Sequence, residues 1–156
     1  MDPNILADLA DSYGLDCRRV TPVSGGWLNK KWRVAGSKGT FLVKQFSRER
    51  FSPRQIEQID AALQRQILLE RKGIPCPYIL PYKGHPIRFL NDGTAYVVMT
   101  FCSGEHRDGK SVTVEQMHSL GECCGILHNA FARLPVQGVK GFPLHGSQLL
   151  DGLWEN

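Results

Sequence analysis

A pair of glycines between two β-rich runs is the feature that most constrains how this chain can fold. Gly25 and Gly26 lie within Val23–Asn29, and the short apolar run Thr40–Lys44 follows soon after. Glycine tolerates positive φ and carries no Cβ, so such a loop turns tightly and lets its backbone approach a ligand. A lysine that ends a neighbouring strand brings an ammonium group to where a phosphoryl oxygen would lie. Together the two elements predict a phosphate-binding loop, whereas either one alone is usually a plain hairpin turn or a solvated lysine.

Length and composition predict a single domain with one hydrophobic core. The chain has 156 residues, of which 42% are hydrophobic. Its net charge of +4 comes from 19 basic and 15 acidic residues, an excess that suits an anionic small ligand. The basic residues on and before the first long predicted helix have no aromatic residues between them. We therefore expect a solvated basic face there and no nucleic-acid partner.

The cysteines and histidines form no recognisable metal or disulfide pattern. The five cysteines are scattered without a C-x-x-C pair, and no histidine lies at metal-ligand spacing from another ligand. We expect reduced thiols and no metal site. The N-terminus lacks a leader pattern, and no apolar run is long enough to span a bilayer, so we expect a cytoplasmic protein without membrane contact.

Periodicity and turn signals predict an α+β fold with a five-stranded antiparallel sheet. The expected strands cover residues 17–23, 31–34, 40–44, 86–90 and 94–101. The expected helices cover 3–13 and 53–72, and a third opens at the capping box Thr113–Gln116 and ends before Pro135. Ser52 is the expected N-cap of the middle helix.

The two long helices each show an apolar stripe. In the first it consists of Ile56, Ile59, Leu63 and Ile67, and in the second of Met117, Leu120, Cys124, Leu127 and Phe131. We expect both stripes to be buried, together with the thiols of Cys123 and Cys124. Beside the first stripe, Glu57, Asp60 and Gln64 form a polar stripe that either faces the strand of Lys44 or is simply solvated.

Five short motifs in this order carry a resemblance to a known family. They are Ser24–Asn29, Phe41–Lys44, Gly73–Pro77, Tyr96–Thr100, and Leu120-Gly121 with Leu127-His128. The chain resembles the amino-terminal, nucleotide-binding lobe of the aminoglycoside phosphotransferase and choline kinase-like superfamily, which includes homoserine kinase-like and CotS-like proteins. The resemblance implies a kinase-like lobe over residues 1–101, a hinge or linker over 102–112, and the start of a truncated second lobe over 113–156.

The resemblance also implies ATP as the ligand and a role for particular residues. Ser24, Gly25, Gly26 and Asn29 would form the loop over the triphosphate, and Lys44 would hold the α- and β-phosphates. Met99–Cys102 would be the hinge, with the Thr100 carbonyl and the Cys102 amide facing adenine. The apolar side chains of Val23, Leu42 and Met99 would line the base pocket, or else belong to the ordinary core.

The sequence departs from the family pattern at the partner of Lys44. The helix position at which such kinases place the acid that pairs with this lysine is occupied by Gln64. Either Glu57 or Asp60 takes that role in a shifted register, or the pair is weakened. The residues alone leave this choice open.

A second departure concerns the catalytic loop. The family's His-x-Asp-x-x-x-x-Asn loop, which supplies the catalytic base and a metal ligand, is not found, and His145-Gly146-Ser147 has Ser where Asp is required. We therefore expect no catalytic residue and no metal ligand in this chain, and Mg²⁺ only with a complete second lobe. The expected function is the ATP-binding lobe of a phosphotransferase that acts on a hydroxyl of a small molecule, inactive as this chain alone.

The alternative is a non-catalytic interaction or regulatory module that keeps the kinase-like lobe. In either case, apolar surface exposed on an isolated lobe would favour a homodimer.

Overall fold

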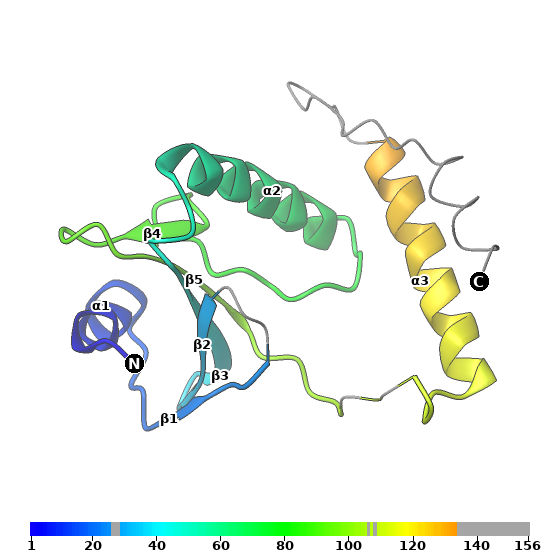
Figure 1. Cartoon of the computed structure of the whole chain (residues 1–156), viewed down its shortest axis with the longest axis horizontal. Helices are drawn as coiled ribbons and strands as arrows, with labels where there is room; N and C mark the ends of the chain where they lie inside the picture. Colours follow the sequence, from blue (N-terminus) through cyan, green and yellow to red (C-terminus); the bar gives the residue numbers. More distant parts are fainter. Residues whose placement is uncertain (26–28, 106, 108, 134–156) are drawn as a thin grey trace.

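The computed structural model describes residues 1–25, 29–105, 107 and 109–133. Its elements in chain order are α1 (Pro3–Tyr13), β1 (Arg19–Pro22), β2 (Asn29–Gly36), β3 (Gly39–Phe46), α2 (Pro53–Arg71), β4 (Ile87–Phe89), β5 (Ala95–Thr100) and α3 (Val114–Ala132). Figure 1 shows the sheet with α1 and α2 beside it and α3 standing apart. The predicted α+β class is confirmed, and so are all three helices and five strands.

The five strands form one antiparallel sheet in the order β1-β2-β3-β5-β4. Gly36 pairs with Gly39, so that only Ser37 and Lys38 form the turn between β2 and β3. The predicted strands 31–34 and 40–44 were therefore too short. Gly39 has a φ of 120°, which a residue with a Cβ rarely adopts, and this conformation lets the strands pair up to the turn.

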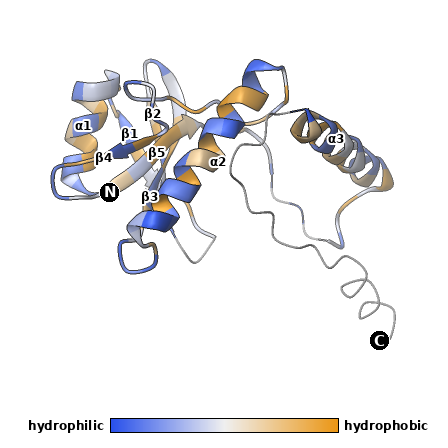
Figure 2. Cartoon of the chain, turned by 90° about the horizontal axis from the view of Figure 1, so that it is seen from above, coloured by the Kyte–Doolittle hydropathy of each residue, from blue (hydrophilic) through white to orange (hydrophobic). Residues whose placement is uncertain are grey.

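The sheet is covered on both faces, and each face has its own apolar cluster. One cluster joins Ile5 and Leu9 of α1 to the sheet, and the other joins Ile56 and Ile67 of α2 to the opposite face. Successive strand residues point to opposite faces. Phe41 and Val43 of β3 therefore belong to the cluster under α1, and Phe46 belongs to the cluster under α2. Figure 2 shows that apolar and polar residues separate onto different sides of α2, as expected for a helix lying on a sheet.

A partly buried cluster of polar side chains holds α1 against the sheet. The Asp8 carboxylate accepts two hydrogen bonds from Arg88 of β4, at 2.7 and 2.9 Å, and another from the hydroxyl of Tyr96 on β5. Ser12 donates a further bond at 2.8 Å. Burial by itself raises the pKa of Asp8, but these hydrogen bonds and the charge of Arg88 outweigh it, so the pKa lies below its usual value.

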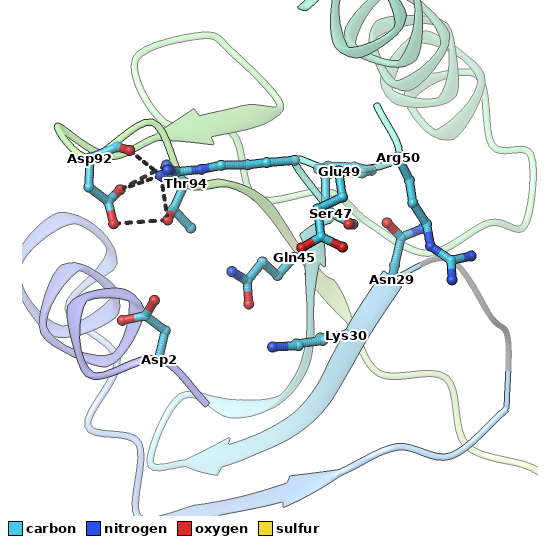
Figure 3. A pocket seen from close by; sticks show the side chains of 11 residues that line it. Asp2, Asn29, Lys30, Gln45, Ser47, Glu49, Arg50, Asp92 and Thr94 are labelled. Carbon is cyan, nitrogen blue, oxygen red and sulfur yellow. Dashed lines mark hydrogen bonds and ion pairs between the residues drawn. The ribbon is translucent and has the colours of Figure 1, made fainter. Parts of the chain in front are cut away.

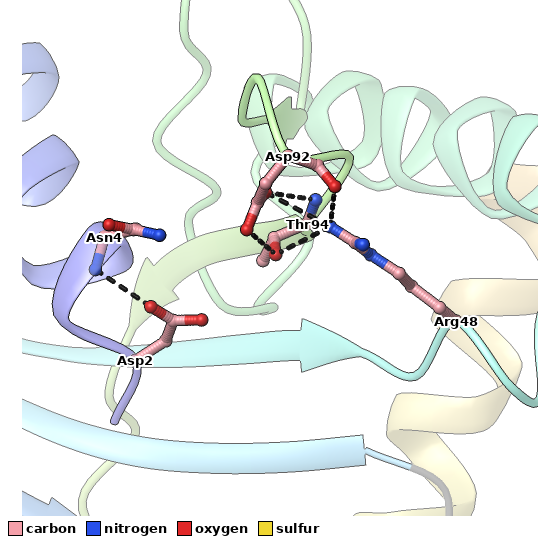
Figure 4. A network of polar contacts seen from close by, with 5 residues as sticks. All are labelled: Asp2, Asn4, Arg48, Asp92 and Thr94. Atoms are coloured by element: carbon pink, nitrogen blue, oxygen red, sulfur yellow. Dashed lines mark hydrogen bonds and ion pairs between the residues drawn. The ribbon is translucent and has the colours of Figure 1, made fainter.

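A second polar network ties the β4–β5 turn to the connection between β3 and α2. Arg48 forms an ion pair with Asp92 at 3.1 Å and donates to the hydroxyl of Thr94 at 3.1 Å, and Asp92 accepts from the Thr94 amide (Figure 4). At the near end of α1, Asp2 caps the helix by accepting from the Asn4 amide at 2.9 Å. The hairpin predicted at residues 91–93 is therefore present, with shorter strands than expected.

The third helix differs from the prediction in its burial. The capping box of Thr113 and Gln116 forms as expected. However, α3 has no buried residue, and Met117, Leu120 and Phe131 are 56%, 56% and 41% exposed. The predicted burial of this stripe was wrong because no other described element packs on it. Cys123 and Cys124 are exposed for the same reason.

Within the described residues, no helix is long and apolar enough to cross a membrane. The predicted positions at Gly26 and at 145–147 lie outside the described residues.

The Asp8 cluster yields a test of what holds α1. Asp8→Asn removes the charge that Arg88 and Tyr96 bind, so the free energy of unfolding at pH 7 should fall by about 2–4 kcal/mol. Asp11→Asn, an exposed change on the same helix, should alter it by less than about 0.5 kcal/mol. Because the folded pKa of Asp8 is depressed, its stabilising contribution is present above the unfolded pKa and is lost as pH falls through the folded pKa. Urea unfolding at neutral and acid pH should therefore show a smaller acid loss in Asp8→Asn than in the parent protein, and equal effects of the two variants would contradict this role.

Candidate functional site

Lys44 lies in the middle of the sheet, in a row of side chains that runs across four strands. Its paired residues are Lys31 on β2 and Val97 on β5, and the Val23 amide donates to the Lys31 carbonyl at 2.9 Å. Directly paired residues point to the same face of a sheet. Val97 belongs to the cluster under α2, so Lys31 and Lys44 are on the face that α2 partly covers.

The glycine loop adjoins this row. It connects the end of β1 to Asn29, the first residue of β2, and Gly25 has a φ of 88°. The Lys31 ammonium donates a hydrogen bond to the Gly25 carbonyl. Ser24 and Gly25 therefore lie on the β1 side of the lysine row. Lys31 lies between this loop and Lys44.

The Lys44 ammonium is half-buried and has no acidic partner among the described residues. The ion pairs within those residues all involve other cations. The Lys44 ammonium lies 5.4 Å from the centroid of the Phe46 ring. Burial, and then the charge of Lys31, lower the pKa of Lys44 below its usual value. An anion placed in this row would relieve both effects.

The three predicted partners of Lys44 make other contacts. Asp60 accepts a hydrogen bond from the Ile87 amide at 3.3 Å, and Gln64 donates to the Gly84 carbonyl at 3.3 Å. Glu57 is exposed and lines a pocket of about 470 Å³ beside β4. In the described part of the chain, Asp60 and Gln64 thus bind backbone groups near the sheet edge formed by β4. Which helix residue pairs with Lys44 in a working site stays a prediction.

An apolar row lies next to the lysine row on the same face. Leu42 pairs with both Arg33 and Met99, and the Arg33 guanidinium lies 5.0 Å from the centre of the Phe101 ring. A hollow of about 180 Å³, lined by Arg19, Thr21, Arg33 and Ala35, continues this face toward β1. Leu42 and Met99, two of the predicted base-pocket residues, are therefore together and only partly buried.

The predicted hinge, Met99–Cys102, begins within this apolar row. The Thr100 amide donates to the Tyr78 carbonyl at 2.8 Å, and its hydroxyl accepts from the Tyr78 amide at 2.9 Å. These bonds hold the end of β5 against the preceding segment. Cys102 follows the strand and is exposed.

Asn29 lines a separate pocket of about 550 Å³ (Figure 3). Its neighbours there include Lys30, Asp2 and Arg50, so the pocket carries charges of both signs. The Asn29 Oδ1 atom is buried and accepts no hydrogen bond from the described residues. Asn29 pairs with Phe46, one row beyond Lys31 and Lys44, so it borders the lysine row without belonging to it.

Lys31 is the residue that the sequence reasoning missed. The signal was present in the two-residue turn, because pairing Gly36 with Gly39 places Lys31 opposite Lys44. The strands predicted over 31–34 and 40–44 leave a five-residue connection, from which no such register follows.

The charge of Lys44, which has no acidic partner among the described residues, should lower the stability of the fold. Lys44→Met keeps the apolar stem and removes a half-buried cation that has no acidic partner in the described structure. The free energy of unfolding should rise by on the order of 1 kcal/mol, as is common where a binding site is kept at the expense of the fold. Lys30→Met, at an exposed position pointing to the other face, should change it by no more than about 0.5 kcal/mol. A clear loss of stability in Lys44→Met would show that the ammonium has a stabilising partner.

Comparisons with known proteins identify the family and the fold. The sequence model of the phosphotransferase enzyme family matches residues 19–153, which is most of the chain. No relative among the curated proteins matches. Among solved structures, the fold is similar to a spectinomycin phosphotransferase in complex with ADP and spectinomycin, with a TM-score of 0.62 and 15% identity. That match covers 85% of this chain but only 38% of the other, so the chain spans well under half of that enzyme. On the match to the family model, this chain belongs to the phosphotransferase enzyme family.

Proposed function

We propose that this chain binds the nucleotide of a phosphotransfer reaction, with ATP as the phosphoryl donor. The observation that carries the proposal is the half-buried Lys44 ammonium, which has no acidic partner among the described residues and lies in one row with Lys31 beside Gly25. A buried cation is costly unless an anion meets it. A phosphate group in this row would supply that anion.

The apolar row gives the same proposal a place for the base. Leu42 and Met99 lie on the same face as Lys44 and one residue pair away from it, and both are partly exposed. A nucleotide with its base over this pair would direct its phosphates to the lysines and to the glycine loop. The spectinomycin phosphotransferase of similar fold holds ADP, which supports a nucleotide as the ligand here.

We propose a hydroxyl of a small molecule as the phosphate acceptor, in line with the family. These 156 residues lack the catalytic loop that supplies the base and a metal ligand. The described residues also contain no group of three or more His, Cys, Asp or Glu side chains that could hold a metal, so they do not fit Mg²⁺ by themselves. The role proposed for this chain is therefore nucleotide binding and not the transfer step.

One observation favours a second candidate, a non-catalytic interaction or regulatory module. Asp60 and Gln64 bind backbone groups of Ile87 and Gly84, and Lys44 faces another lysine instead of an acid. Under this alternative, saturating nucleotide would leave the thermal unfolding of the protein unchanged.

The nucleotide proposal is tested by binding. ATP or ADP at saturating concentration should stabilise the protein by about 1 kcal/mol or more, and Lys44→Ala should abolish the effect without loss of the fold. Isothermal titration and a thermal shift measure both, with circular dichroism as the check on folding. Lys30→Ala, which removes a lysine on the opposite face, serves as the matched control. Unchanged nucleotide binding in Lys44→Ala would refute the phosphate role of Lys44.

We also propose that the exposed stripe of α3 mediates a homodimer. Met117 and Leu120 are both 56% exposed, which leaves apolar surface in contact with water. Sedimentation should then show dimers that Leu120→Glu converts to monomers. Asn129→Glu, which adds the same charge on the other side of the helix, should leave the dimer intact. A parent protein that stays monomeric at every concentration would contradict the proposal.

A further inference from the structure

Lys31 lies between Lys44 and the glycine loop, where its ammonium group can contact a ligand directly. It pairs directly with Lys44 across β2 and β3, and both side chains point to the same face of the sheet. Its ammonium donates to the Gly25 carbonyl at the start of the glycine loop. An ammonium has three donors, and the carbonyl uses one of them. The described residues contain no carboxylate ion-paired with either lysine.

Two like charges directly opposite each other destabilise a sheet. In agreement with this, the pKa of Lys44 is lowered by burial and by the charge of Lys31. Among the described residues, the polar contact of the side chain at position 31 is its hydrogen bond to the Gly25 carbonyl. A second lysine at that position therefore lowers the stability of the empty protein and gains its value when an anion is present.

We propose that Lys31 is a second phosphate-binding residue, which together with Lys44 makes the site select nucleotides by the charge of their phosphate tail. This inference rests on the proposed nucleotide function and adds a specificity-determining residue to it. A single phosphate reaches one lysine well, whereas a di- or triphosphate extends along the row and meets both ammonium groups. Binding should therefore rise steeply from adenosine to AMP to ADP.

The experiment compares ligands that differ only in this tail. Titration calorimetry of adenosine, AMP and ADP is done with the parent protein and with Lys31→Gln, Lys31→Arg and Lys44→Gln. Lys31→Gln should weaken ADP about tenfold or more, the usual effect of removing one hydrogen bond to a charged group, and should leave adenosine unchanged. Lys31→Arg should retain most of the affinity for ADP. Lys30→Gln removes the neighbouring lysine on the opposite face and should have no effect on any of the three ligands.

The competing explanation is that Lys31 only shapes the glycine loop through Gly25. In that case Lys31→Gln would weaken adenosine and ADP by the same factor, and this result would overturn the inference. It would also be overturned if ADP affinity fell in Lys44→Gln but not in Lys31→Gln. Inorganic diphosphate separates the inference from the function on which it rests. If diphosphate binds and requires Lys31 while ADP does not bind, the nucleotide assignment fails and the anion role of Lys31 stands; if neither binds to the parent protein, both fail.

Discussion

The register between β2 and β3 is the constraint on which the arrangement of this molecule depends. The turn of Ser37 and Lys38 allows the strands to pair up to Gly36 and Gly39, and the Asp16 carboxylate accepts from the Ser37 amide at 2.7 Å. A slip of one residue in a strand would turn every side chain to the other face. Lys44 would then face α1, and Val43 would take its place on the α2 face. The same pairing also sorts the apolar residues into the clusters under α1 and under α2.

The two faces of the sheet differ in whether their central charged side chains have partners of opposite charge. Under α1, the Asp8 carboxylate is met by Arg88, Tyr96 and Ser12, so that each charge has a partner and the cluster stabilises the fold. On the α2 face, two lysines are opposite each other without an acid from the described residues. This contrast is the physical reason for which we propose the anion site on the α2 face and not on the α1 face.

The sequence predicted local features well and long-range pairings poorly. The helix over residues 3–13 was predicted to the residue because its glycine C-cap, Gly14, acts within a single turn. The lengths of β2 and β3 were underestimated because the turn at residues 37–38 is shorter than the predicted connection. The contacts of Asp60 and the exposure of Leu120 depend on where distant elements lie, and helical periodicity carries no information about whether a partner is present. Lys31 was not predicted as a site residue, because its place opposite Lys44 depends on the register set by the two-residue turn.

The first helix precedes the residues that match the family, which begin at position 19. Nevertheless Ile5 and Leu9 are fully buried, and they cover Trp32, Val34 and Tyr96 on the sheet. A protein shortened to the family-matched residues would expose these three side chains to water. It would also lack Asp8, whose carboxylate pairs with Arg88. The folding unit of this molecule therefore includes α1, which lies outside the residues that the family model matches, and a chain shortened to those residues would expose apolar surface that favours aggregation.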